Sequence, residues 1–145
     1  MLRPAITEPT GTVAFSCAYP ARPADLAVIR SDLRRLLRDC PAAGDVILCA
    51  SELAANATLH SNSRRPGGTL TVRAEIRRGE YVRVEVDDRG GPWAEPGPDP
   101  ERPHGLDLIA VVAAAWGMID TAAGRTVWAR VSWRPGLPEP WREAR

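Results

Sequence analysis

The chain has 145 residues, a formal net charge of +1 and 19 basic residues, all of them arginine. This length suits a single domain, the balanced charge disfavours direct binding to nucleic acid or to a membrane surface, and the absence of lysine disfavours a Walker-type nucleotide site. The three cysteines lack metal-ligand spacing and no segment approaches the roughly 20 apolar residues of a membrane span, so we expect a cytoplasmic protein.

The first half of the chain predicts one strand followed by two helices. Residues 12–19 have the composition of a short strand, and two prolines then mark the start of a helix over about residues 23–40. Leucine and isoleucine recur in that helix at three- and four-residue steps, with arginines on the other side, which is typical of an amphipathic surface helix. A turn at residues 41–45 leads into a second helix that ends near residue 61.

Residues 69–78 and 81–88 are predicted to form two strands that are joined by a turn around Gly79. Alternate positions of the second strand are valines that share one face. Period-two alternation therefore places Asp88 on the buried face and Asp87 on the outer face. An acidic side chain at the inner end of a core strand is unusual, which makes Asp88 a candidate functional residue.

The C-terminal part predicts a loop, a helix and two strands. The proline-rich stretch 92–103 cannot form a regular element and is interpreted as a stiff loop. The following segment, GLDLIAVVAAAWG, predicts a helix that starts near Gly105 and is well buried because it is apolar on almost every side. Residues 116–121 and 125–133 supply the last two strands.

This order of elements predicts an α/β two-layer sandwich, in which three helices cover one face of a mostly antiparallel, mixed sheet. We expect residues 12–133 to form one domain. Residues 1–11 are expected to be a mobile N-terminus and residues 134–145 a mobile tail, because both are short terminal segments outside the predicted elements.

The second helix carries Glu52, Asn56 and His60 at successive spacings of four, so the three side chains project from one side of the helix. The amide oxygen of Asn56 suits a hard cation such as Mg²⁺, and the Glu52 carboxylate suits general-base work. For this pair alone, a solvated helix face is an equally good interpretation.

Two further segments contain candidate ligand-binding residues. Asp88 precedes Arg89, Gly90 and Gly91, so a buried acceptor can take a hydrogen bond from an exocyclic amine while the glycines let a flat ring approach. Taken alone, this motif is more often a β-turn with a capping aspartate. Gly105 opens a helix after a long loop, and the N–H groups at a helix N-terminus attract phosphate, although glycine is common at helix starts.

Together these segments resemble the GHKL (Bergerat-fold) superfamily of ATPases and kinases over residues 12–133. Within it, the chain is most similar to the small anti-sigma-factor serine/threonine kinases and their single-domain relatives in actinobacteria. The resemblance rests on three motifs. The N box corresponds to SELAANATLH with Ser51, Glu52, Asn56 and His60, the G1 box to Asp88-Arg89-Gly90, and the G2 box to Gly105-Leu106-Asp107-Leu108.

The resemblance implies a Bergerat fold that binds ATP and Mg²⁺. Asn56 would bind the Mg²⁺ on the phosphates, Asp88 the adenine amine, and the Gly105 amide the phosphate chain. Glu52 would deprotonate a serine hydroxyl of an antagonist protein, and a sigma factor would be the second partner. The further nucleotide-binding positions are Gly90, Leu106, His60 and Arg102, of which Arg102 is more often simply a solvated arginine.

The sequence departs from the family pattern at two glycines. Pro92 stands in place of the second glycine of the G1 box, and Pro103-His104 precedes Gly105, so the first glycine of the G2 box is missing. The short proline-rich loop also limits closure over the phosphates. We therefore keep a catalytically inactive, partner-sequestering module as the alternative to a kinase, and we leave homodimer formation open. Alternation groups Thr126 with Trp128 on the face opposite Val127, so we do not assign Thr126 to the adenine site.

Overall fold

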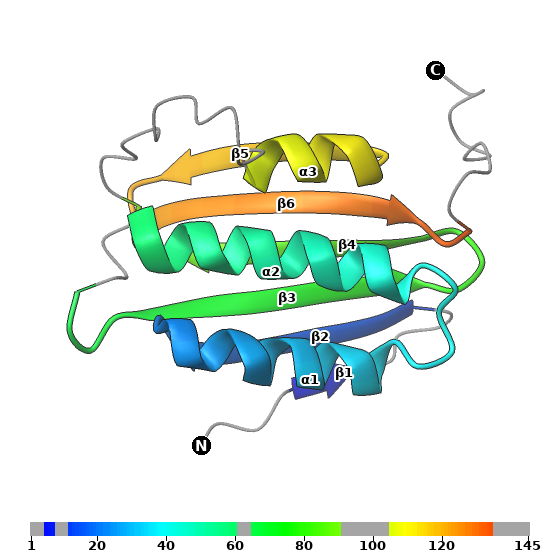
Figure 1. Cartoon of the computed structure of the whole chain (residues 1–145), viewed down its shortest axis with the longest axis horizontal. Coiled ribbons are helices and arrows are strands. Elements are labelled where there is room, and N and C mark those ends of the chain that lie inside the picture. The colour runs from blue at the N-terminus through cyan, green and yellow to red at the C-terminus, as the bar shows by residue number, and fades with distance from the viewer. Residues whose placement is uncertain (1–4, 8–11, 61–64, 91–104, 135–145) are drawn as a thin grey trace.

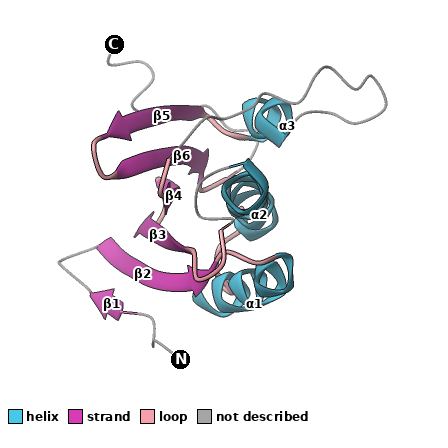
Figure 2. Ribbon diagram, turned by 90° about the vertical axis from the view of Figure 1, so that its left-hand side faces the viewer, coloured by secondary structure: helices cyan, strands magenta, loops and turns pink. Residues whose placement is uncertain are grey.

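The computed structural model describes residues 5–7, 12–60, 65–90 and 105–134. A six-stranded sheet in the order β1-β2-β3-β4-β6-β5 forms one layer, and three helices cover one face of it (Figures 1 and 2). The strands are β1 (Ala5–Thr7), β2 (Thr12–Pro20), β3 (Thr69–Arg77), β4 (Tyr81–Asp88), β5 (Ala115–Thr121) and β6 (Gly124–Ser132). The helices are a 3-10 turn, η1 (Pro23–Asp25), and α1 (Leu26–Leu36), α2 (Ala43–His60) and α3 (Gly105–Val112).

The predicted α/β two-layer sandwich is confirmed. Every pairing between the described strands is antiparallel, so the mixed component that we expected does not occur among them. The sheet also begins earlier than predicted, because β1 pairs with β2 and places Ala5 opposite Ser16. Residues 135–145, the greater part of the predicted tail, lie outside the described residues. Within the described part of the chain, no helix is long and apolar enough to cross a membrane.

The core lies between the helices and the sheet and follows the alternation of the strands. In β3 and β4 every second side chain is buried on the helix face, which includes Val82, Val84 and Val86. The helices contribute large buried side chains such as Leu33 from α1 and Leu53 from α2. Burial of each such side chain stabilises the fold by about 1.5–3 kcal/mol before entropy is counted.

The amphipathic first helix forms as predicted, but its regular part is shorter than residues 23–40. Pro23 opens a 3-10 turn, where the fixed φ of proline is tolerated because the first N–H groups of a helix lack intrahelical partners. After Leu36, the N–H groups of Leu37 and Cys40 donate to the carbonyls of Leu33 and Leu37, which closes the helix with a turn.

The third helix differs from the prediction in length and in burial. Regular α3 ends at Val112, and the N–H of Ala114 donates to the Arg130 carbonyl at 2.8 Å, so the chain joins the sheet as β5. Ile109 alone is buried among residues 107–112, and Val111 is 81% exposed. The prediction of a well-buried helix is therefore wrong, because apolar composition all round a short helix at the edge of a layer does not provide neighbours on every side.

Candidate functional site

The three segments that carry the predicted motifs lie on neighbouring elements of the sandwich. Helix α2 packs on β4 and against α3. In Figure 1 the last turns of α2, the end of β4 and the turn between β5 and β6 lie at the left-hand end of the sheet, and α3 lies nearer the middle with its start directed toward that end. The fold thus places stretches that are distant in the sequence on neighbouring elements.

Asp88 is the last residue of β4, and its side chain lies on the helix face, as alternation predicted. The residue is 7% exposed. Its Oδ1 accepts a hydrogen bond from the Gly90 N–H at 2.6 Å, whereas its buried Oδ2 accepts none from the described residues. Burial raises the pKa of this carboxyl above its ordinary value, and the Gly90 hydrogen bond and the positive charge of Arg125 oppose the rise. The site therefore contains a buried acceptor to which none of the described residues donates.

Two glycines let the end of β4 and the β5–β6 turn touch. Gly90 has a φ of 68°, and a Cβ on it would lie 3.4 Å from the Gly124 Cα. A Cβ on Gly124 would overlap the backbone carbonyl oxygen of Asp88. Gly90 was predicted to let a flat ring approach. In the structure its positive φ completes the turn after β4, in which its N–H donates to the Asp88 carboxylate.

On α2, Glu52 and Asn56 are half-buried at the margin of the face that packs on the sheet. The Nδ2 atom of Asn56 is buried and has no hydrogen-bond partner among the described residues. Cys49 lies one turn before Glu52, and burial, followed by the negative charges of Asp45 and Glu52, raises the pKa of its thiol to about 12. Asp45, Glu52 and Asn56 therefore lie on one side of α2, close to Cys49.

The remaining predicted positions are described only in part. Gly105 and Leu106 are the first two residues of α3, so their backbone N–H groups lie at a helix N-terminus, but nothing is described of the Leu106 side chain. His60 is the last residue of α2, and its side chain likewise falls outside the description. Arg102 lies outside the described residues.

Arg125 lies next to Asp88 in the sheet but is not among the predicted site residues. The pairing of β4 with β6 sets Arg125 opposite Asp88, so both side chains project from the helix face. The Arg125 side chain is 15% exposed, and its Nε lies 2.7 Å from the Asp120 Oδ1. Thr126 projects from the opposite face, as alternation predicted, and its hydroxyl donates to Asp87 there. The same alternation was the available signal for Arg125.

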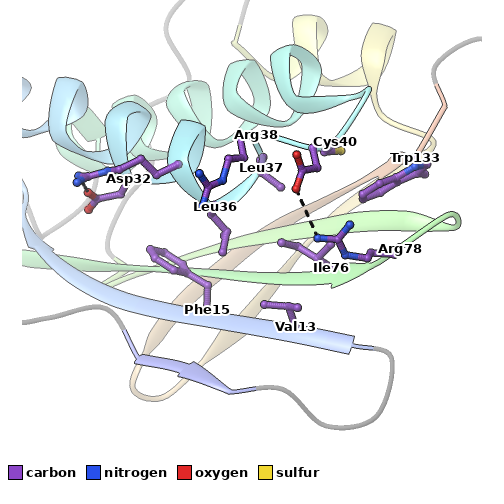
Figure 3. Close-up of a pocket in the computed structure, with 12 residues that line it drawn as sticks. Val13, Phe15, Asp32, Leu36, Leu37, Arg38, Cys40, Ile76, Arg78 and Trp133 are labelled. Atoms are coloured by element: carbon purple, nitrogen blue, oxygen red, sulfur yellow. Dashed lines mark hydrogen bonds and ion pairs between the residues drawn. The ribbon is translucent and has the colours of Figure 1, made fainter.

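Two cavities that are lined by described residues lie away from this end. A cleft of about 460 Å³ opens between α1 and strands β2 and β3, and Figure 3 shows Phe15, Leu36 and Trp133 around it. Arg78 and Asp39 form an ion pair of 3.9 Å at its rim. A second hollow of about 410 Å³ lies on the helix-free face of the sheet, between β2, β3 and β4. Neither is lined by a predicted site residue.

Comparisons with known proteins address the family directly. A family model described as a histidine kinase-like ATPase domain matches residues 19–131. Among solved structures, the fold is similar to that of the RsbU and RsbW domains of Rv1364c from Mycobacterium tuberculosis, with a TM-score of 0.63 and 21% sequence identity. That match covers 86% of this chain and 33% of that chain, so this chain spans about a third of its length. No curated protein matches the chain.

The family match includes all three segments that carry the predicted motifs. It confirms the resemblance to the GHKL superfamily that the motifs predicted. The solved structure supports the same fold independently, through similarity of backbone rather than of sequence. The chain belongs to the histidine kinase-like ATPase domain family.

Proposed function

We propose that the chain binds ATP between α2, the end of β4 and the start of α3. The observation that carries the proposal is the Asp88 carboxyl, which is buried and has an Oδ2 atom without a donor among the described residues. A buried, unpaired acceptor costs about 1–3 kcal/mol, and an adenine amine would supply the missing donor. Gly90 and Gly124 keep the neighbouring backbone free of side chains, so a flat ring can approach Asp88.

The phosphates and Mg²⁺ would lie between α2 and the N-terminus of α3. Among the described residues no group of three His, Cys, Asp or Glu side chains can hold a metal ion by itself. Mg²⁺ does not need such a cluster, because it binds mainly phosphate oxygens and water with one or two protein ligands. Asn56 would supply the protein ligand through its Oδ1, and its buried Nδ2, which has no partner among the described residues, would donate to a phosphate oxygen. The Gly105 and Leu106 N–H groups, His60 and Arg102 would contact the phosphate chain.

The proposed reaction is transfer of the γ-phosphoryl group to a serine of an antagonist protein. Glu52, one turn before Asn56 on the same side of α2, would accept the proton of the attacking hydroxyl. Phosphoryl transfer depends mainly on positioning and on neutralising charge, so Asn56 with its metal and the α3 N-terminus would carry much of the catalysis. A sigma factor is the second proposed partner, and the cytoplasm is the proposed location.

A second function has specific support in the sequence. Pro92 and Pro103-His104 stand where the family pattern has glycines of the G1 and G2 boxes, in the stretch that is expected to limit closure over phosphates, whereas Asp88 is retained. A module that binds nucleotide, lacks transfer and acts by sequestering a partner is therefore the alternative.

Two measurements test these proposals. Titration calorimetry with ATP, with and without Mg²⁺, should detect binding that Asp88→Asn weakens about tenfold or more, because a charge-assisted hydrogen bond is lost. Incubation with labelled ATP, Mg²⁺ and candidate antagonist proteins should label a serine. Glu52→Gln should abolish labelling and spare binding, whereas Glu80→Gln, in the turn after β3, should change neither. ATP affinity unchanged in Asp88→Asn would reject the site, and binding without labelling would favour the sequestering module.

A further inference from the structure

Beside Asp88, three side chains of alternating charge lie in one row across the sheet. Strand pairing sets Asp88 of β4 opposite Arg125 of β6, and Arg125 opposite Asp120 of β5. Side chains directly opposite each other in an antiparallel pair project from the same face, with their Cβ atoms about 4.5–5.5 Å apart. The three side chains therefore share the helix face at the end of the sheet where the proposed nucleotide site lies.

Arg125 is largely buried, and a hydrogen bond to the exposed Asp120 fixes the direction of its side chain. Asp120 is 71% exposed, whereas the Arg125 side chain is 15% exposed. The Nε–H of Arg125 donates to the Asp120 Oδ1 at 2.7 Å, so one edge of the guanidinium is directed toward β5. A guanidinium carries five N–H donors in a fixed plane, so it can contact neighbours within the protein through one edge and a ligand through another.

We propose that Arg125 is a second base-recognition residue, which donates a hydrogen bond to a ring nitrogen of adenine while Asp88 accepts one from the neighbouring amine. The inference rests on the proposed ATP site. Adenine presents a donor, its amine, flanked on either side by a ring-nitrogen acceptor. A carboxylate and a guanidinium side by side on one sheet face present the complementary acceptor and donor.

The pattern of occupied carboxylate atoms supports this arrangement. Oδ1 of Asp88 already accepts the Gly90 N–H, and Oδ2 is the atom that lacks a donor among the described residues. The site therefore presents one open carboxylate oxygen beside the guanidinium, which matches a single amine next to a single ring acceptor. The positive charge of Arg125 also lowers the pKa of Asp88 against the effect of burial, which favours the ionised, accepting form of the carboxyl.

Ligands that lack one ring nitrogen test the proposal. The affinities of the wild-type protein for ATP, 1-deaza-ATP and 7-deaza-ATP are measured by calorimetry, and one of the two analogues should bind about tenfold or more weakly than ATP. Arg125→Leu should bind ATP more weakly by a similar factor and should show no further loss with that analogue. Arg130→Leu, which removes the same charge from the opposite face of β6, should keep the wild-type pattern.

A further variant and a folding control separate recognition of the adenine ring nitrogen from a general effect of charge or folding on ATP affinity. Asp120→Ala retains Arg125 but removes the acceptor of its Nε–H, so it should reduce the penalty of the sensitive analogue without abolishing ATP binding. Thermal melting of each variant checks folding. If both analogues bind the wild-type protein as tightly as ATP, or if Arg125→Leu retains the wild-type penalty, the proposal is overturned even though ATP binds. If the wild-type protein binds no ATP, the proposed function itself fails.

Discussion

At the scale of single residues, Asp88 makes the stability of the protein depend on pH. Burial raises the pKa of its carboxyl above the ordinary value of 3.8, so the folded protein holds this proton more tightly than the unfolded chain. The resulting stabilisation is complete below the ordinary pKa and is lost as the pH rises through the raised pKa. Because Asn cannot titrate, the unfolding free energy of wild type relative to Asp88→Asn should fall as the pH rises from the ordinary pKa towards neutrality. Denaturant titrations measure this difference, and a constant value would contradict the raised pKa.

A second residue-scale prediction concerns the contact of Gly124 with Asp88. A Cβ on Gly124 would overlap the Asp88 carbonyl oxygen, so Gly124→Ala should destabilise the fold by more than about 2 kcal/mol and weaken ATP binding. Gly79→Ala is the matched control, since Gly79 has a φ of 81° but a Cβ on it would meet no atom within 4 Å. It should cost only the backbone strain of about 1–2 kcal/mol and leave binding unchanged. Equal effects of the two substitutions would show that steric overlap at Asp88 is unimportant.

Alternation explains which residue orientations the sequence could predict. It placed Asp88 inward and Thr126 outward correctly, because both lie in regular strands with a clear apolar face. Applied to Arg125, it would also have indicated the inner face. The position of Arg125 opposite Asp88 and its ion pair with Asp120 depend on how three strands pair, which no pattern within one strand determines.

At the scale of elements, α3 shows where local pattern is insufficient. Its sequence is apolar on nearly all sides, yet it ends at Val112 and is anchored through Ile109. Ile109→Ala should therefore cost about 2–5 kcal/mol of unfolding free energy, as expected for a fully buried side chain. Val111→Ala, at an 81% exposed position of the same helix, should change it by no more than about 0.5 kcal/mol. Similar losses in denaturant titrations would mean that α3 is buried on both sides.

The other helices were predictable because tertiary neighbours reinforce their sequence patterns. In α1 the buried stripe of Ile29 and Leu33 opposes a surface rich in arginine, so local periodicity and burial agree. In α2 the motif residues Glu52 and Asn56 border the buried face. The sequence could identify these candidate residues and their element, whereas their spatial relation to Asp88 depends on how α2 packs over β4.

At the scale of the whole molecule, the cleft and the proposed nucleotide site occupy opposite ends of the sheet. The cleft is lined by residues such as Val13, Arg78 and Trp133, where β2 begins and where β3 and β6 end. Asp88 lies where β4 ends and β6 begins. Substitutions in the two places should therefore be separable, because residues that share no contact partners usually contribute independently.

This separation permits a test of ATP binding through the stability of the entire fold. A ligand that binds only the folded state raises the unfolding free energy by about 2.7 kcal/mol at a concentration of about 100 Kd. ATP with Mg²⁺ should therefore raise the melting temperature of the wild-type protein, and omission of Mg²⁺ should reduce the rise because the proposed Asn56 contact is lost. Arg78→Ala, at the rim of the cleft, should retain the full rise, whereas Asp88→Asn should show a smaller one at the same ATP concentration. A rise that is reduced by Arg78→Ala and unaffected by Asp88→Asn would instead assign the nucleotide to the cleft beside α1.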